Sequence, residues 1–285
     1  MGAAGLIEIK RRMKSVESTR KITKAMNIVA TSKLRKVRNE LNKNEDYYNL
    51  SKEILKKVVA LLPEEYESPF LNNLSKDLID SKLYIVITSD TGFCGGFNSN
   101  IINTLNDSIE DKDSAKFIVA GLRGIQYMKK FGLTTIREYI EIPDIPTTKE
   151  VRAIYDDALF MYKNKEVSEV NIVYTEYRSA ISQEIIIERI FPVDIEKEDP
   201  EEIIFEPDLE KVLSSSLDSY LKSKIRRAML HSKASEQNAR MKTMDSSTDN
   251  ANDILKALTT NYNRIRQGMI TQEISEIVGG AEALK

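Results

Sequence analysis

A glycine-rich stretch, residues 89–98, is the first place in the sequence where phosphate chemistry is conceivable. It reads Ser-Asp-Thr-Gly-Phe-Cys-Gly-Gly-Phe-Asn, between a run that predicts a strand and a segment that predicts a helix. Such turns can bind nucleotide phosphates through backbone N–H groups at a helix N-terminus. This one lacks the Lys-Ser/Thr pair of a Walker motif and the glycine spacing of a dinucleotide site. We therefore favour a structural interpretation, in which the glycines permit a tight turn and close packing.

Cys94 is the only cysteine in the chain and the second candidate for chemistry. A nucleophilic cysteine needs a base, and the only histidine, His231, falls in a helical pattern where a satisfied or solvated imidazole is expected. No acidic residues form an obvious acid–base pair. One Cys and one His argue against a metal site, and a single cysteine excludes an internal disulfide, which fits a reducing compartment. We expect no catalytic, cofactor-binding or metal-binding residue.

Basic residues dominate residues 10–38, where eleven Lys and Arg face a single acid, Glu17. Acidic residues concentrate far away, between residues 196 and 206. The first helix is therefore expected to meet an acidic partner. A nucleic acid is one such partner, because basic-zipper proteins also combine a basic helix with heptads. Here, however, the basic residues and the heptads overlap in one segment, and the nearest aromatic residues lie beyond it.

Two long helical patterns, one at each end of the sequence, must position these groups. Apolar residues recur at spacings of three and four from Leu6 to Leu62, as in a heptad coiled coil, and Pro63 ends the pattern. A second stripe covers residues 208–278. We expect helices of about 85 and 105 Å that bury their stripes against each other as an antiparallel pair.

The first helical pattern has one interruption, at Arg20, Thr23 and Asn27. The nearby apolar residues, Met26 among them, lie one step off the register. We expect the pairing of the two helices to loosen or shift there.

Between the helical patterns, short apolar runs alternate with helical segments. The predicted strands are residues 83–87, 116–120, 135–140 and 170–174 and a fifth from residue 185; the predicted helices are residues 98–107, 122–130 and 149–162. This alternation predicts an open α/β sheet with crossover helices. We expect three domains: an N-terminal coiled-coil helix (1–62), an α/β domain with an acidic connector (63–207) and a C-terminal coiled-coil helix (208–285).

Three segments of the sequence resemble one known family. The first, residues 9–35, contains Ile-Lys-Arg-Arg-Met-Lys-Ser-Val, Thr-Arg-Lys-Ile-Thr-Lys-Ala-Met and Val-Ala-Thr-Ser-Lys-Leu-Arg. The second is the glycine-rich stretch. The third, residues 235–273, opens with Ser-Glu-Gln-Asn-Ala-Arg-Met and closes with Ile-Thr-Gln-Glu. In this order along the whole length, they resemble the gamma subunits of F-type ATP synthases.

The resemblance implies a fold, an antiparallel coiled coil on a Rossmann-like α/β domain, and a role. Gamma subunits are the central shaft of the rotary complex, with one copy in each. The tip of the shaft lies inside the ring of alternating alpha and beta subunits, and its base couples to epsilon and to the c-ring of the membrane sector. Ion flow turns the shaft, which drives the beta sites through states of different nucleotide affinity. Catalysis belongs to beta, so the resemblance implies a non-catalytic chain.

The resemblance also implies which residues would touch the stator. Basic residues of the first helix would face an acidic loop of beta, and three polar residues of the last helix lie in stator-contacting motifs of the family. The candidates are Lys10, Arg11, Arg12, Lys24, Met26, Lys33, Arg35, Lys36, Arg266, Gln272 and Glu273.

The sequence departs from the family pattern in the glycine-rich stretch. Thr91 stands where the family usually has Arg, and Phe93 where it has Leu. The side chain that would make the polar contacts of that Arg is therefore missing from this sequence. The cysteine-bearing insert of chloroplast gamma subunits is also missing, which excludes that form of thiol switching.

The sequence has no apolar run long enough to span a bilayer and no secretory signal or transit peptide at its N-terminus. We expect a bacterial protein that is peripheral to the cytoplasmic side of the plasma membrane, without direct insertion and without nucleic acid. Two alternatives stay open: a nucleic-acid-binding protein with a basic coiled-coil arm, and a nucleotide-binding enzyme that uses the glycine-rich turn.

Overall fold

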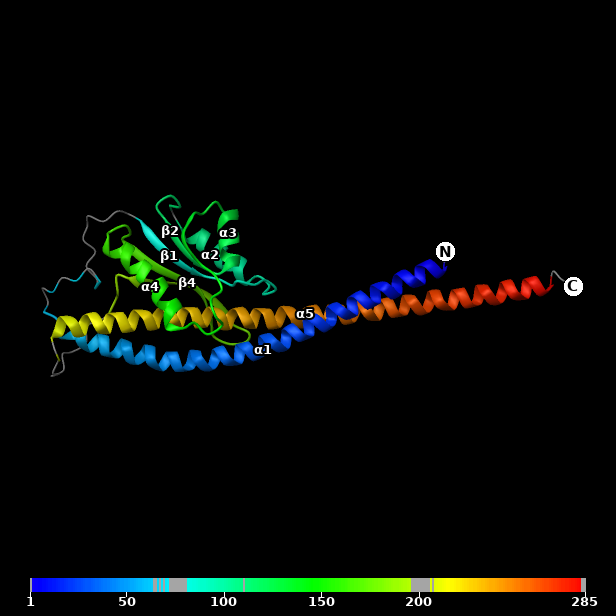
Figure 1. Ribbon diagram of the computed structural model, residues 1–285, viewed down its shortest axis with the longest axis horizontal. Coiled ribbons are helices and arrows are strands. Elements are labelled where there is room, and N and C mark those ends of the chain that lie inside the picture. The colour runs from blue at the N-terminus through cyan, green and yellow to red at the C-terminus, as the bar shows by residue number, and fades with distance from the viewer. Residues whose placement is uncertain are drawn as a thin grey trace. The chain divides into compact units, whose positions relative to one another are not determined.

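The computed structural model describes residues 2–63, 66, 68, 70–71, 81–109, 111–195, 206 and 208–282. The chain divides into two compact units (Figure 1). The helical unit combines residues 1–30 with residues 240–285, and the α/β unit is residues 31–239. Most of the predicted acidic connector, residues 196–205 and 207, lies outside the described residues. The division into three domains at residues 62 and 207 stays a prediction.

Two long helices supply residues to both units. They are α1, Gly2–Ala60, and α5, Leu209–Glu282, and they confirm the two long helices predicted at the ends of the sequence. The first turn of α5 is capped by Asp208, whose Oδ1 accepts a hydrogen bond from the backbone N–H of Lys211 at 2.8 Å. At the C-terminal end of α1, Pro63 follows the last helical turn, as expected for a residue that cannot continue a helix.

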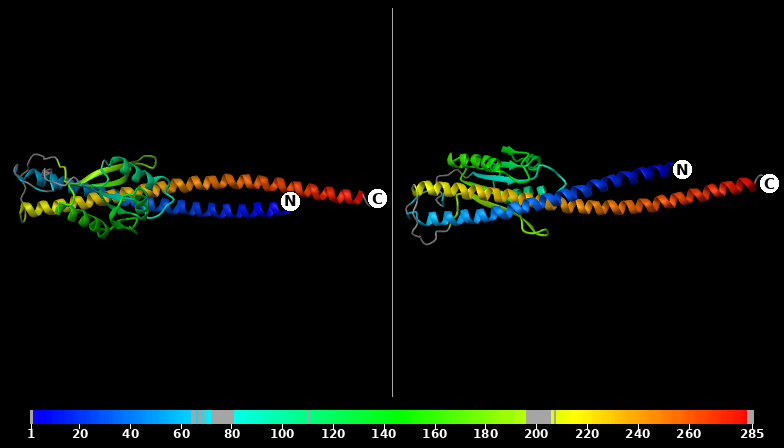
Figure 2. Two further views of the ribbon diagram at one scale, coloured as in Figure 1. Left: turned by 90° about the horizontal axis from the view of Figure 1, so that it is seen from above. Right: turned by 60° about the horizontal axis from the view of Figure 1, so that its bottom comes forward.

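In the helical unit, the ends of α1 and α5 run side by side and antiparallel (Figure 2). Three polar side chains hydrogen-bond across the pair: Arg20 to Asn252 at 3.3 Å, Thr23 to Thr248 at 2.8 Å and Asn27 to the carbonyl of Met241 at 3.0 Å. The predicted loosening at these positions is therefore wrong.

The register of α1 continues through the polar positions because their side chains find partners on α5. Thr23 is only 8% exposed, whereas the off-register Ile22 and Val29 are 59% and 53% exposed. A buried polar group costs little once it is hydrogen-bonded. Polar residues can thus occupy heptad positions without interrupting the helix pair.

The α/β unit is built on a five-stranded sheet with the order β3-β2-β1-β4-β5. Its strands are β1 (Lys82–Ile87), β2 (Lys116–Ala120), β3 (Thr135–Tyr139), β4 (Glu169–Tyr177) and β5 (Gln183–Phe191). The first four pair in parallel, and β5 pairs antiparallel with β4. The predicted α/β sheet with crossover helices is confirmed, although β4 and β5 are longer than the sequence indicated.

Helices cover both faces of the sheet, as the alternating buried side chains of β1 require. They are α2 (Phe97–Ser108), α3 (Leu122–Lys130) and α4 (Thr148–Lys163). Tyr84 and Val86 pack with α2 and α3 on one face. Leu83, Ile85 and Ile87 pack on the other face with α4 and with the parts of α1 and α5 that belong to this unit. The coiled-coil helices therefore form one layer of the α/β core.

Candidate functional site

The glycine-rich turn between β1 and α2 is closed by its own side chains. The Asn98 side chain accepts a hydrogen bond from the backbone N–H of Ser89 at 3.0 Å and donates to Ser89 Oγ at 2.8 Å and to Cys94 Sγ at 3.3 Å. Asn98 and Cys94 are buried, and Phe93 is 69% exposed with a positive φ of 62°. Gly95 also has a positive φ, 57°, which favours glycine. This geometry favours the structural interpretation of the turn over a phosphate site.

His231 contacts β4 and α1, whereas Cys94 contacts Ser89, Thr91 and Asn98 within the glycine-rich turn. His231 is 5% exposed, and its Nδ1 accepts a hydrogen bond from the backbone N–H of Tyr177 at 3.3 Å. Its Nε2 lies 3.5 Å from a carboxylate oxygen of Glu45. The expected satisfied or solvated imidazole is thus met at Nδ1, whereas Nε2 is buried without a hydrogen-bond partner.

A partly buried ionic cluster that the sequence did not predict surrounds His231 in the α/β unit. At its centre, Arg227 of α5 places Nε 2.9 and 2.8 Å from the two carboxylate oxygens of Glu45 on α1. The same guanidinium donates to the Tyr174 hydroxyl on β4 at 3.2 Å and lies 3.6 Å from Glu176. The Cζ atom of Arg227 is also 5.2 Å from the centre of the Tyr48 ring on α1. Arg227 thus joins two helices and the sheet.

The cluster changes the pKa of its carboxylate. Burial alone would raise the pKa of Glu45, but polar contacts with His231 and Arg227 and the charge of Arg227 lower it to about 2. Burial alone would lower the pKa of Arg227, but the hydrogen bond to the Glu45 carboxylate and the charge of that group raise it above its ordinary value. The pair is therefore ionised at neutral pH.

This depressed pKa predicts how acid affects the α/β unit. Since the folded pKa of Glu45 lies below its ordinary value of 4.5, its contribution is complete above about pH 4.5 and is lost as pH falls toward 2. Partial exposure limits the contribution to about 1 to 2 kcal/mol. We expect the difference in free energy of unfolding between wild type and Glu45→Gln to shrink by this amount between pH 5 and pH 2. Urea titrations at each pH would measure it, and a constant difference would contradict the assignment.

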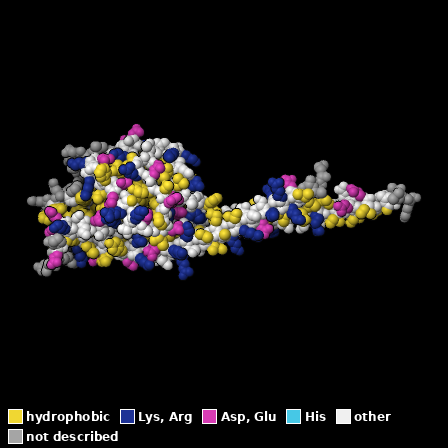
Figure 3. Space-filling view, viewed as in Figure 1, with side chains coloured by type: hydrophobic (Ala, Val, Ile, Leu, Met, Phe, Trp, Pro, Cys, Tyr) yellow, Lys and Arg dark blue, Asp and Glu magenta, His cyan; other side chains and the backbone are white. Residues whose placement is uncertain are grey.

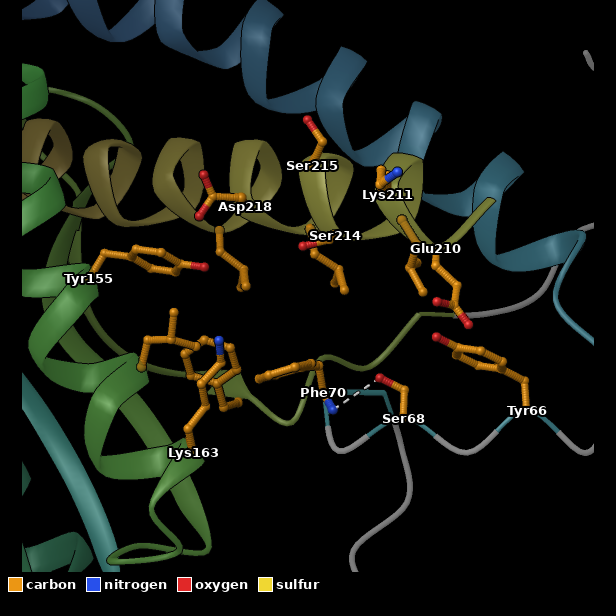
Figure 4. A pocket seen from close by; sticks show the side chains of 15 residues that line it. Tyr66, Ser68, Phe70, Tyr155, Lys163, Glu210, Lys211, Ser214, Ser215 and Asp218 are labelled. Carbon is orange, nitrogen blue, oxygen red and sulfur yellow. Dashed lines mark hydrogen bonds between the residues drawn. The ribbon is translucent and has the colours of Figure 1, made fainter. Parts of the chain in front are cut away.

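The α/β unit has a cavity of about 510 Å³ that is lined by residues of α4 and α5 (Figure 4). Both lysines that line it have partners within the chain. Lys211 Nζ lies 3.0 Å from Asp208, and Lys163 Nζ lies 5.6 Å from the centre of the Phe70 ring. Neither lysine of this cavity is therefore free of a partner within the chain, and the nucleotide-binding alternative gains no support from them.

The predicted basic contacts lie on α1, and most of them are exposed. Figure 3 shows Lys and Arg side chains on the surface of the molecule. In the helical unit, Lys10, Arg11, Arg12 and Lys24 are exposed, and Met26 is half-buried.

In the α/β unit, Arg35 and Lys36 are exposed, but Lys33 forms an ion pair with Asp144 at 2.9 Å. Lys33 is thus already committed to a partner inside the chain. The structure assigns the candidates to two separate units and does not gather them into one site.

The last turns of α5 form an exposed segment that bears the other three candidates. Every described side chain of residues 270–281 is exposed, Gln272 and Glu273 among them, and Arg266 is exposed just before this segment. Apolar residues at helical spacing line one side of it: Ile270 is 43% exposed, Ile274 56%, Ile277 72% and Val278 57%. The sequence predicted that this end of the stripe would be buried against α1, and the structure shows instead that it is uncovered.

The described part of the chain contains no group of three or more His, Cys, Asp or Glu side chains that could hold a metal ion. Its helices are also too short or too polar to span a membrane.

Comparisons with known proteins agree along the whole chain. A family model described as ATP synthase matches residues 5–284. The chain is 50% identical to the ATP synthase gamma chain of Clostridium botulinum (strain Eklund 17B / Type B), over 100% of both chains. It is 48% identical to the ATP synthase gamma chain of Clostridium beijerinckii, over 99% of both.

Solved structures share the fold at lower sequence identity. A chain of the Euglena gracilis mitochondrial ATP synthase (OSCP/F1/c-ring, rotational state 3) has a TM-score of 0.70 and 17% identity, covering 99% of this chain and 95% of that one. A chain of the Tetrahymena thermophila mitochondrial ATP synthase (central stalk/c-ring) has a TM-score of 0.59 and 21% identity, covering 79% and 98%. From the family match and the full-length identity to bacterial relatives, we conclude that the chain belongs to the ATP synthase gamma chain family, the non-catalytic rotor subunits of that complex.

Proposed function

We propose that this chain is the shaft that couples ion flow through a c-ring to ATP synthesis or hydrolysis at beta subunits. Its partners would be the alpha and beta subunits, epsilon and the c-ring, and it would be peripheral to the cytoplasmic side of the cell membrane. In this proposal, residues 1–62 and 208–285 are the coiled-coil part of the shaft, and residues 63–207 form the α/β base.

The observation that carries the proposal is the uncovered end of α5. An apolar stripe at Ile270, Ile274, Ile277 and Val278 is costly in water and is typical of a surface that another protein covers. The flanking polar residues Arg266, Gln272 and Glu273 are exposed and would contact the same partner. The ring of alpha and beta subunits is the partner that the family suggests.

The exposed cations of α1 would make the second set of contacts. A rotor has to bias each state of the stator without binding tightly to any one state. Exposed charge pairs contribute about 0 to 1 kcal/mol each, which suits contacts that form and break at every step. The candidates for this role are Lys10, Arg11, Arg12, Lys24, Lys33, Arg35 and Lys36, and Lys33 would first have to leave Asp144. Met26, half-buried on the same helix, would add an apolar contact.

Reconstitution with partner subunits tests the proposal. The chain alone is expected not to hydrolyse ATP. When it is added to purified alpha and beta subunits, their turnover should rise, because an asymmetric shaft moves the beta sites between states of different affinity. Turnover would be measured in a coupled ATPase assay after gel filtration of the complex. A stable complex whose turnover equals that of alpha and beta alone would overturn the proposal, and duplex binding with a steep salt dependence would favour the nucleic-acid alternative.

A further inference from the structure

The apolar contacts between α1 and α5 do not fix the register of the two helices by themselves. On α1, Leu41, Tyr48 and Leu55 follow one another at intervals of seven residues, and all three are buried in the α/β unit. If α1 moved by one heptad, each of these positions would again be occupied by an apolar side chain. Heptad seams of this kind are compatible with more than one register unless a polar group distinguishes them.

The partly buried ionic cluster supplies one such distinction, beside the buried Asn44, which donates to the Ser223 carbonyl of α5 at 3.2 Å. Glu45 is the residue of α1 that pairs with Arg227, and the residues seven positions before and after it are Arg38 and Lys52. A displacement by one heptad in either direction would therefore bring a cation toward the Arg227 guanidinium. Two like charges in a partly buried site repel each other strongly, and a buried cation without its partner is costly.

Of the three residues of α1, Arg38 is exposed and Glu45 and Lys52 are half-buried, and each interacts with the sheet or with α5. Arg38 Cζ is 5.6 Å from the centre of the Tyr177 ring on β4, and the charge of Lys52 acts on the buried Lys224 of α5. The other ionisable side chains at the cluster are Glu176, 3.6 Å from Arg227, and His231, 3.5 Å from Glu45. Among Arg38, Glu45 and Lys52, which follow one another at intervals of seven, only the observed register places the carboxylate against Arg227.

We propose that Arg227 is a positioning residue that sets the register of α1 against α5 and β4 through Glu45, while Arg38 and Lys52 disfavour the neighbouring registers. Directional contacts support this role, since Arg227 meets α1 through both carboxylate oxygens and β4 through the Tyr174 hydroxyl. Buried ion pairs add little net stability compared with apolar packing, and setting register is their best-attested use. If the proposed function is correct, the same pair also fixes the level along α5 at which Lys33, Arg35 and Lys36 are presented.

A distance measurement on the full chain tests the register directly. Spin labels at Asn39→Cys on α1 and Ser215→Cys on α5, in a Cys94→Ala background, would report the offset of the helices within the α/β unit. Asn39 and Ser215 are exposed, and one heptad moves a label by about 10 Å along the helix axis. The wild-type chain should give one narrow distance distribution.

Two variants carry the test. In Arg38→Glu/Glu45→Arg the carboxylate moves by one heptad with no change in composition, and a second distance population is expected, displaced by several ångströms. Arg227→Met should broaden the distribution, and Arg227→Lys should restore a single distance with a wider spread. Arg152→Met, which removes a surface cation paired with Asp156 on α4, is the matched control and should match wild type.

The outcome decides the register proposal independently of the rotor function, because the measurement needs no partner subunit. A folded Arg38→Glu/Glu45→Arg chain with only the wild-type distance would overturn the proposal. If that variant does not fold, Arg227→Met decides: an unchanged narrow distribution in a folded chain means that packing alone sets the register.

Discussion

Replacing Gly124 by alanine is expected to lower the free energy of unfolding of the α/β unit by about 2 to 3 kcal/mol, because the new methyl group has no space. A Cβ at this position would lie 2.8 Å from Thr88 Cγ2 and 3.0 Å from Thr88 Cβ, and it would overlap Thr88 Oγ1. That hydroxyl cannot move freely, since it donates to the carbonyl of Ala120 at 2.8 Å and accepts from the N–H of Gly124 at 3.1 Å. Helix α3 would have to shift away from the end of β1.

Urea unfolding would measure this loss, followed by tyrosine fluorescence because the chain contains no tryptophan. The matched control is Gly268→Ala, in an exposed stretch of α5 with no atom within 4 Å of the new Cβ. It should leave the α/β unit unchanged and favour the helix by about 1 kcal/mol. Adding Thr88→Ala to Gly124→Ala should recover part of the loss. If the losses of the two single variants simply add, the steric explanation is wrong.

The elements of this fold could be predicted from local patterns, because each pattern has a local physical cause. The heptad spacing from Leu6 to Leu62 predicts α1 to within a few residues, and the prolines predict where helices cannot continue. The apolar run at residues 83–87 predicts β1 because a strand buried on both faces needs no polar alternation. Strand order and pairing became visible only in the structure.

The polar positions of α1 show where a local pattern misleads. Thr23 and Asn27 interrupt the apolar stripe in sequence, so they predicted a gap in the pairing. Their partners, Thr248 and the Met241 carbonyl, are 225 and 214 residues away, and no spacing rule within one helix can identify them. Whether a polar residue breaks a helix pair depends on the facing helix.

The partly buried ionic cluster was missed for the same reason. Glu45 and Arg227 are 182 residues apart, and each alone resembles a charge on a solvated helical face. One local signal was available: Glu45 directly follows Asn44 of the heptad stripe and is flanked at seven residues by Arg38 and Lys52. A single acid in a basic stripe at heptad spacing indicates a specific partner, although it does not identify Arg227.

Replacing Arg266, Gln272 and Glu273 together by alanine is expected to reduce ATP synthesis by membrane vesicles about three- to tenfold while the complex still assembles. The three side chains are exposed on α5, so their removal should cost the isolated chain little stability. Gln272 does donate to Glu276 at 2.9 Å, but an exposed pair of this kind contributes only a few tenths of a kcal/mol. Any larger effect must come from contacts that the segment makes in the complex.

The expected size follows from the nature of those contacts. Three exposed polar or charged contacts, each worth about 0 to 1 kcal/mol, together account for about 1 kcal/mol of bias between stator states, which corresponds to a several-fold change in rate. Ile270, Ile274 and Ile277 are unchanged in the variant, so the apolar stripe should still seat the end of α5. The variant is therefore expected to assemble normally while its rate of ATP synthesis falls.

ATP synthesis by vesicles and ATP hydrolysis by the detached complex would be measured side by side, with assembly checked by gel filtration. Asp253→Ala/Lys256→Ala/Thr260→Ala is the control, since these residues are also polar and exposed on α5 but precede the uncovered segment. Losses confined to the first variant would support the contacts proposed for Arg266, Gln272 and Glu273. Wild-type rates of synthesis and hydrolysis in an assembled triple variant would mean that the shaft couples through its apolar stripe or through α1, and that these three residues are not the contacts.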